Sequence, residues 1–73
     1  MRNVYNRLRL GLNIRMRRHI LRLTQVQLAE KVGCGRQYIS TLERGKRDMS
    51  VEKLFAISRA LECSMADLLE NVE

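Results

Sequence analysis

The stretch LTQVQLAEKVGCGRQYISTLERG, residues 23–45, decides the fold of this 73-residue chain. Thr24 offers a hydroxyl that can cap a helix, and Gln27 stands three residues later, where a capping box needs Glu or Gln. Gly33 can end that helix, because glycine takes the left-handed conformation of a helix C-terminus without a Cβ penalty. A short turn separates this helix from a second one expected over about residues 36–44, which another glycine follows. The stretch therefore predicts two short helices joined by a tight turn.

Three further helices are predicted outside this pair, because apolar residues recur at helical spacing on both sides of it. Ser50 can cap a fourth helix, and Ser64 with Asp67 repeats the capping pattern before a short fifth one. The residues expected to face the core are Leu10, Ile14, Arg18 and Leu21 in the first helix and Val51, Leu54, Ile57, Ala60 and Leu61 in the fourth. The chain has no proline and is 45% hydrophobic, so we expect a single all-α domain over residues 1–73.

The segment from Leu23 to Leu69 resembles the phage-repressor and Cro-like helix-turn-helix family, often called the XRE family. The resemblance covers about residues 10–69 and leaves about residues 1–9 as an extension of helix one. It rests on residues that fall at the family's spacing without a gap, namely Thr24, Gln25, Leu28, Ala29, Gly33, Ile39, Ser40, Leu42, Glu43 and Gly45. It implies a compact five-helix, lambda-repressor-like DNA-binding domain. It also implies an ion pair between Arg18 and Glu43 that fixes the angle between two helices.

The chain departs from the family pattern at four positions. Gly35 replaces the usual Ser or Thr before the third helix, which makes a weaker cap. Cys34 and Cys63 stand where branched apolar residues are usual, so we expect reduced thiols that act as small buried apolar residues, rather than a disulfide. Met49 stands where proline is common.

Charge is divided unevenly along the chain. Residues 1–47 hold twelve basic residues against two acidic ones, whereas residues 48–73 hold two basic against six acidic ones. Eleven of the fourteen cations are arginine, whose planar guanidinium pairs with phosphates and base edges. A basic first part favours a polyanionic partner, and with the resemblance this partner is expected to be double-stranded DNA.

The resemblance places the third helix, about residues 36–44, in the major groove as the recognition helix. We expect Arg36 and Gln37 to make bidentate contacts with guanine and adenine respectively. The complete set of expected base contacts is Arg36, Gln37, Ser40 and Thr41. The expected phosphate contacts are Gln25, Tyr38, Arg44, Lys46 and Arg47. Packing against helix two is the competing interpretation for Tyr38, and a solvated turn for Lys46 and Arg47.

A single domain of this size reads too few base pairs to select one genomic site, so a homodimer on a palindromic or pseudopalindromic operator is expected. The 73 residues leave no room for a separate dimerisation domain, so we expect the two chains to contact each other through the DNA-binding domain itself. One candidate surface consists of Met65, Leu68, Leu69 and Val72 near the C-terminus. A second candidate consists of Val4, Leu8 and Leu12 on the N-terminal extension. We favour the C-terminal surface, and each stripe could instead belong to the core.

Other function classes are disfavoured by the residues present. An enzyme would need a nucleophile beside a base or paired carboxylates, and one histidine with no such pair offers no catalytic site. His19, Cys34 and Cys63 are at none of the usual zinc spacings, so no metal, other cofactor or small-molecule ligand is expected. A protein-interaction module that uses the same fold remains the alternative. No segment reads as a signal peptide or a membrane span, which favours a cytoplasmic protein, nucleoid-associated or phage-encoded.

Within the resemblance, small members include phage repressors, restriction–modification controller proteins and antitoxins. The absence of a toxin-wrapping tail disfavours the antitoxins. The operator, the target genes, the choice between repression and activation, and any effector are left open by the sequence.

Overall fold

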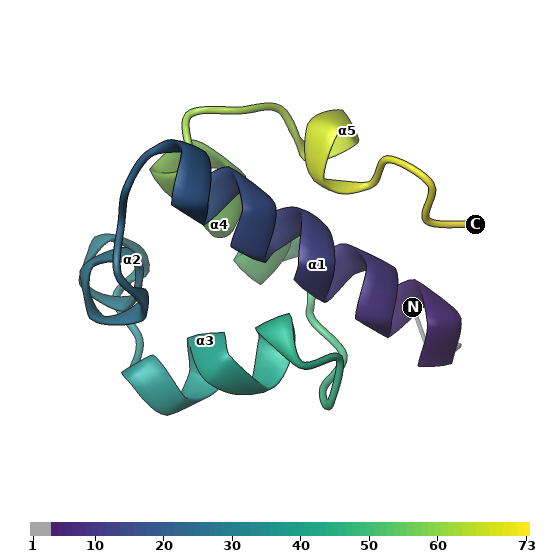
Figure 1. Ribbon diagram of the computed structural model, residues 1–73, viewed down its shortest axis with the longest axis horizontal. Coiled ribbons are helices and arrows are strands. Elements are labelled where there is room, and N and C mark those ends of the chain that lie inside the picture. Colours follow the sequence, from purple (N-terminus) through teal and green to yellow (C-terminus); the bar gives the residue numbers. More distant parts are fainter. Residues whose placement is uncertain (1–3) are drawn as a thin grey trace.

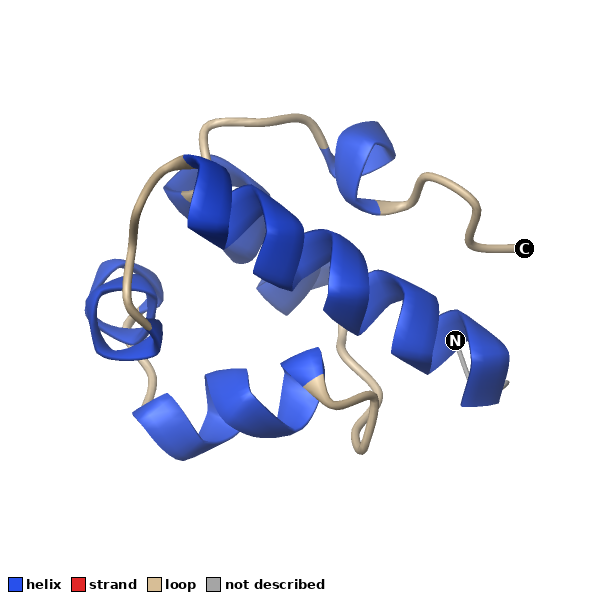
Figure 2. Ribbon diagram, in the orientation of Figure 1, coloured by secondary structure: helices blue, strands red, loops and turns tan. Residues whose placement is uncertain are grey.

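The computed structural model describes residues 4–73, which form helices joined by loops, with no strand (Figure 2). The elements in chain order are α1 (Val4–Ile20), α2 (Gln25–Val32), α3 (Arg36–Glu43), α4 (Val51–Ala60) and α5 (Met65–Leu68). The predicted all-α, five-helix architecture is therefore confirmed. Residues 1–3 of the predicted N-terminal extension lie outside the described residues, and the remainder of it is the first part of α1.

The predicted caps define the helix boundaries. At α2, the Gln27 amide donates to Thr24 Oγ1 at 3.0 Å, and the Thr24 amide donates to Gln27 Oε1 at 2.8 Å. The same reciprocal pair joins Ser64 and Asp67 at α5, with both bonds at 3.0 Å. The Lys53 amide donates to the Ser50 hydroxyl at 3.1 Å at the start of α4. Because each cap satisfies amides that a helix start leaves unpaired, these short helices begin where the sequence predicts.

The helices enclose one hydrophobic core. Figure 1 shows α1 crossing the molecule, with α3 below it, α5 above it and α4 behind it. The buried apolar residues are Leu10, Ile14, Leu28, Ala29, Ile39, Leu42, Leu54, Ile57, Leu61 and Leu68. The prediction that Val51 faces this core is wrong, since Val51 is the first residue of α4 and 72% of it is exposed.

Gly11 sets how closely α1 approaches α3. A Cβ atom at this position would press against the Leu42 carbonyl oxygen and lie 2.7 Å from the carbonyl oxygen of Glu43. Both obstacles belong to the backbone at the end of α3, so no side-chain rearrangement could relieve them. The absence of a side chain at Gly11 therefore lets the first helix rest directly on the last turn of α3.

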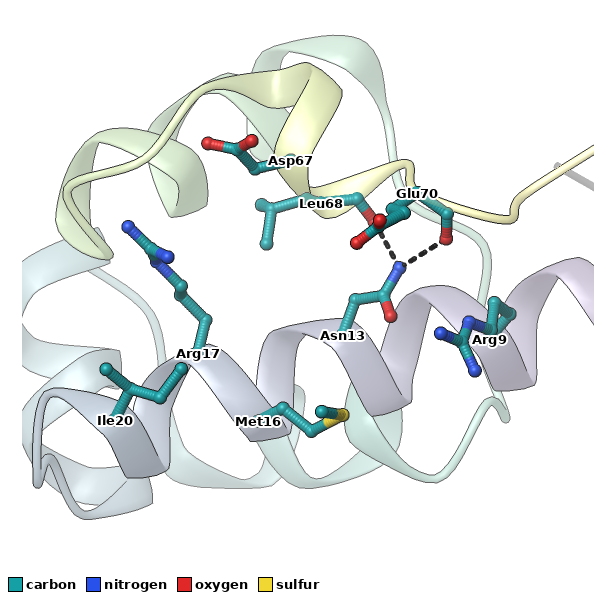
Figure 3. Close-up of a pocket in the computed structure, with 8 residues that line it drawn as sticks. All are labelled: Arg9, Asn13, Met16, Arg17, Ile20, Asp67, Leu68 and Glu70. Carbon is teal, nitrogen blue, oxygen red and sulfur yellow. Dashed lines mark hydrogen bonds between the residues drawn. The ribbon is translucent and has the colours of Figure 1, made fainter.

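Polar side chains of α1 hold the C-terminal segment against that helix. Asn13 Nδ2 donates to the carbonyl oxygens of Leu68 and Glu70, each at 2.8 Å, as the dashed lines in Figure 3 show. Asn6 bonds both backbone groups of Glu73, donating to its carbonyl oxygen at 2.5 Å and accepting from its amide at 2.9 Å. Since the last carbonyls of a helix lack partners within it, Asn13 supplies a cap that α5 cannot make alone.

Replacing Asn13 by alanine is expected to lower the free energy of unfolding by about 0.5–1.5 kcal/mol, because the partly buried Leu68 carbonyl and the exposed Glu70 carbonyl lose their partner. Hydrogen exchange should localise the effect. The Val72 amide, which bonds the Leu69 carbonyl in the adjoining turn, should lose more protection than the amides of α2. Gln37→Ala, an exposed change on α3, is the control and should stay within about 0.5 kcal/mol. A uniform loss of protection in α2 and the C-terminal segment would contradict this local role.

Candidate nucleic-acid interface

Helices α2 and α3 are joined by a tight turn built on two glycines. Gly33 has φ +86°, and its amide donates to the Ala29 carbonyl at 2.8 Å. The Cys34 amide donates to the same oxygen at 3.0 Å. Gly35 precedes α3 as its N-cap with no side-chain hydrogen bond. This is the helix-turn-helix geometry that the sequence predicts, with the weak cap at Gly35.

Arg18 and Glu43 form the predicted ion pair inside the molecule. Arg18 Nε lies 2.7 Å from Glu43 Oε2, and Arg18 Nη2 lies 3.0 Å from Oε1, so the contact is bidentate. Arg18 Nη1 also donates to the Leu23 carbonyl at 2.8 Å. The two side chains are only 10% and 3% exposed. The pair therefore fixes α1, the end of α3 and the loop before α2 in one arrangement.

The ion pair continues into the predicted DNA-contacting residues. Gln25 Nε2 donates to Glu43 Oε1 at 3.1 Å, and Arg36 Nη1 donates to Gln25 Oε1 at 3.4 Å. Gln25 is the first residue of α2 and Arg36 the first of α3. Gln25 is thus bonded to the buried pair, and Arg36 reaches Gln25 through a longer, solvent-exposed contact.

The four predicted base-contacting residues lie along α3. Arg36 and Gln37 are exposed on its first turn, whereas Ser40 and Thr41 are partly buried on the next turn. The Thr41 hydroxyl donates to the Tyr38 carbonyl at 2.8 Å, so its proton is already used within the helix. The N-terminal half of α3 therefore presents a guanidinium and an amide to solvent.

The predicted phosphate-contacting residues surround this face of α3. Arg44, Lys46 and Arg47 are exposed after the helix, while Gln25 and Tyr38 are partly buried. The Arg47 guanidinium carbon lies 4.9 Å from the centre of the Tyr38 ring. Burial raises the pKa of Tyr38 above its ordinary value, against the opposing effect of the Arg47 charge. Tyr38 thus keeps its proton and can donate a hydrogen bond to an anion.

Lys53 is a member of this surface that the sequence analysis missed. Its ammonium nitrogen lies 5.5 Å from the centre of the Tyr38 ring, within cation–π range. Lys53 belongs to the acidic part of the sequence, and no linear pattern connects it with residue 38. The structure therefore extends the cationic border of α3 onto α4. We call the exposed face of α3 together with Arg44, Lys46, Arg47 and Lys53 the recognition surface.

The C-terminal residues predicted to form a dimer contact are engaged in their own core. Leu68 is 1% exposed, so it offers almost no surface to a second chain. Met65, Leu69 and Val72 are partly buried and pack against the same core. Leu68 is thus a core residue, whereas the other three keep part of their surface accessible, and their role in a dimer contact stays a prediction.

Both cysteines are free and partly buried within the described chain, and burial raises the pKa of the Cys63 thiol, against the charge of Arg17. Over residues 4–73, no three His, Cys, Asp or Glu side chains gather into a group that could hold a metal ion. No helix in the same range combines the length and apolar character needed to cross a bilayer.

The turn geometry and the buried ion pair agree with the family to which the sequence matches. The helix-turn-helix family HTH_3 matches residues 14–68. The chain belongs to this helix-turn-helix family. The match contains both paired helices, Arg18, Glu43 and most of the core, and it confirms the resemblance on which the sequence analysis relied.

The relatives of this helix-turn-helix chain include a control protein and a phage repressor. Control protein C.SmaI from Serratia marcescens is 40% identical over 57 residues, which cover 78% of this chain and 68% of that protein. Repressor protein C2 of Salmonella phage P22 is 39% identical over 62 residues, which cover 85% of this chain. The matched region spans only 29% of the phage repressor's length.

Two solved structures share the fold of this helix-turn-helix chain. The restriction–modification controller protein C.AhdI from Aeromonas hydrophila superimposes with a TM-score of 0.85 at 28% identity, covering 88% of this chain and 97% of that one. The P22 c2 repressor in complex with a synthetic operator superimposes with a TM-score of 0.78 at 39% identity, covering 84% and 92%. The lambda-repressor-like fold predicted from the sequence is therefore confirmed.

Proposed function

We propose that this chain is a transcriptional regulator that binds a palindromic or pseudopalindromic DNA operator as a homodimer, with α3 in the major groove. The observation that carries the proposal is the polar network from the buried Arg18–Glu43 pair through Gln25 to Arg36. It holds a guanidinium at the exposed start of α3, inside a border of cations. The operator complex of the P22 c2 repressor and the control function in the name of C.SmaI support the same interpretation.

Base recognition is assigned to the exposed part of α3. Arg36 can donate two hydrogen bonds to guanine O6 and N7, and Gln37 can bond adenine N6 and N7. Ser40 and the Thr41 methyl group lie one turn further, where a thymine methyl can be contacted. Each half-site is therefore expected to contain a G close to an A or T.

Phosphate binding is assigned to the border of that helix. Arg44, Lys46 and Arg47 are exposed cations, and Lys53 adds a partly buried one. Tyr38 and Gln25 contribute neutral donors. Such contacts fix the register of a protein on the duplex and carry no sequence information themselves. They predict binding that weakens steeply as the salt concentration rises.

We propose a homodimer because one α3 helix contacts too few base pairs to select a single genomic site. A single recognition helix contacts about four or five base pairs, and dimers of this motif bind half-sites about 34–36 Å apart, one helical turn. The two half-sites together supply the specificity that a single chain lacks.

The experiment that tests this function is enrichment of duplexes from a random pool by the full chain, followed by sequencing. The proposal expects an inverted repeat whose half-sites contain a G within the region read by α3. Recovery of sequences with no shared motif would contradict sequence-specific recognition and favour a protein-interaction module.

Two arginine variants should separate base reading from phosphate binding. Arg36→Ala is expected to cost about 1–3 kcal/mol on the enriched duplex and to relax the preference for G at one position. Arg44→Ala is expected to weaken binding to all duplexes alike and to reduce the salt slope by about one. Anisotropy titrations with guanine and with 7-deazaguanine at that position provide the measurement. If Arg36→Ala remained as sensitive as the native chain to loss of guanine N7, Arg36 would not be the reader.

A further inference from the structure

The N-terminal half of α1 runs along the end of α3 and along the loop that follows it. Gly11 rests against the last turn of α3, and Leu8, one turn earlier on α1, meets Gly45 in the loop. Arg7 adds a second contact with the same residue, since its Nε atom lies 3.4 Å from the Gly45 carbonyl oxygen. The contacts of α1 thus continue from the helix end into the loop, which Figure 1 shows below α1.

Gly45 lets Leu8 approach the backbone of this loop. Gly45 is buried and has φ +69°. A Cβ atom at this position would lie 2.7 Å from Leu8 Cδ2 and 2.9 Å from Leu8 Cα. Because the second of these atoms belongs to the backbone of α1, a change of the Leu8 rotamer alone could not make room. Leu8 therefore packs directly on the loop, although 50% of its own surface is exposed.

The loop carries two of the predicted phosphate contacts. Residues 46–50 belong to no helix, and Lys46 and Arg47 are both exposed. The Lys46 amide donates to the Thr41 carbonyl at 3.0 Å, and the Arg47 guanidinium carbon lies 4.9 Å from the centre of the Tyr38 ring. Helix α3 thus holds the loop from one side, and Leu8 holds it from the side of α1.

An acidic residue follows these two cations, and Arg7 lies beside it. Arg7 Nη1 is 3.9 Å from Asp48 Oδ1, and the two side chains are 23% and 47% exposed. An ion pair this long and this accessible contributes little to stability. Its main consequence is electrostatic, because a cation lies next to a carboxylate that would repel a phosphate.

We propose that Leu8, supported by Arg7, is a positioning residue for DNA binding, because it holds Lys46 and Arg47 in place before a duplex arrives. The proposal rests on the proposed function, since it concerns the phosphate contacts of the recognition surface. A loop that is already ordered loses less conformational entropy on binding, which strengthens the complex. The family match begins at residue 14, so both positioning residues lie outside the part of the chain that the family model covers.

The first test uses the chain without DNA and follows hydrogen exchange of the Gly45 and Lys46 amides, whose hydrogen bonds close the end of α3. Leu8→Ala should lower the protection of these two amides more than that of the amides in α2. Met16→Ala is the matched control on the same helix, because Met16 is 52% exposed and lines the pocket between α1 and the C-terminal segment (Figure 3). It should leave the loop amides unchanged.

The second test is a cycle of variants, measured by anisotropy titration against the enriched duplex and the shuffled duplex. Leu8→Ala should weaken binding to both duplexes by about tenfold, the order expected when one or two residues must be ordered on binding. In a chain that already carries Lys46→Ala and Arg47→Ala, the same substitution should weaken binding less than about twofold, because Leu8 acts through these two cations. A role in general stability alone would give the same loss in both backgrounds.

The contribution of Arg7 is tested against an arginine that carries the same charge elsewhere on α1. Arg7→Gln and Arg9→Gln each lower the net charge by one, and Arg9 lies beside the C-terminal segment (Figure 3). Arg7→Gln should weaken DNA binding at least about threefold more than Arg9→Gln. Equal losses would show a general effect of charge and would remove Arg7 from the proposal.

Circular dichroism should show equal helicity for the native chain and for every variant. Native protection of the loop amides in Leu8→Ala, or the same fold-loss in both loop backgrounds, would overturn the proposal. A native chain that binds neither duplex would overturn the proposed function and this role together. A native chain that binds DNA no better than Leu8→Ala would overturn this role alone, so the two failures are distinguishable.

Discussion

Replacing Arg18 by alanine is expected to lower the free energy of unfolding by about 3–5 kcal/mol, because the Glu43 carboxylate is left buried without its cation. That carboxylate side chain is 3% exposed and receives both guanidinium bonds. Among residues 4–73, the Gln25 side-chain amide alone would remain to donate to it. A domain of this size has a total stability of about 4–11 kcal/mol, so the variant should lose a large fraction of it.

Urea denaturation followed by circular dichroism measures the Arg18 effect. Arg15→Ala is the matched control, because Arg15 is an exposed arginine on the same helix and should matter by less than about 0.5 kcal/mol. The double variant Arg18→Met, Glu43→Leu should recover most of the lost stability, since an apolar pair of similar volume often replaces a buried ion pair without loss. A loss below about 1 kcal/mol for Arg18→Ala would contradict a buried anchor.

Replacing Gly11 by alanine is expected to destabilise the chain by about 1–3 kcal/mol or more, because overpacking forces two backbone segments apart. The sign of this stability change distinguishes a crowded glycine from an exposed one. At an exposed position within a helix, the same substitution stabilises by about 1 kcal/mol through helix propensity. Here the added Cβ meets carbonyl oxygens of Leu42 and Glu43, so α1 must move away from α3. The displacement would also disturb the Arg18–Glu43 ion pair, because Glu43 is one of the two residues that the added Cβ meets.

The contrasting glycine substitution is Gly35→Ser. Gly35 has φ −85°, which any residue adopts, and no atom lies within 4 Å of a Cβ at that position. A serine there supplies the missing cap, so thermal unfolding should show a gain of about 0.5 kcal/mol. If Gly11→Ala raised the midpoint, as Gly35→Ser is expected to do, the close approach of α1 to α3 would not constrain the fold.

The features that the sequence predicted depend on neighbouring residues along the chain. A capping box needs Thr24 and Gln27 three residues apart, and a left-handed helix end needs Gly33, so both are visible in linear spacing. The Arg18–Glu43 pair spans 25 positions, and it was predicted only through the family resemblance.

The features that the sequence missed depend on contacts between distant segments. Gly11 and Asn13 look like ordinary residues of an amphipathic helix, and their roles appear only when α3 and the C-terminal segment are in place. Lys53 reaches Tyr38 across the fold in the same way. The two apolar stripes were indistinguishable in sequence, because helical spacing alone does not tell a buried face from an exposed one. The structure shows that Leu68 is buried in the core, whereas Leu8 is half exposed.

The central claim is that the recognition surface reads a base sequence, and the most direct measurement is a titration of the full chain against two labelled duplexes. One is the enriched inverted repeat and the other is a shuffled duplex of equal composition, both at physiological salt. The account predicts at least about a thousandfold preference for the enriched duplex, with two chains bound per site. Equal affinity for both duplexes that disappears as salt rises would show phosphate attraction alone and would contradict the account.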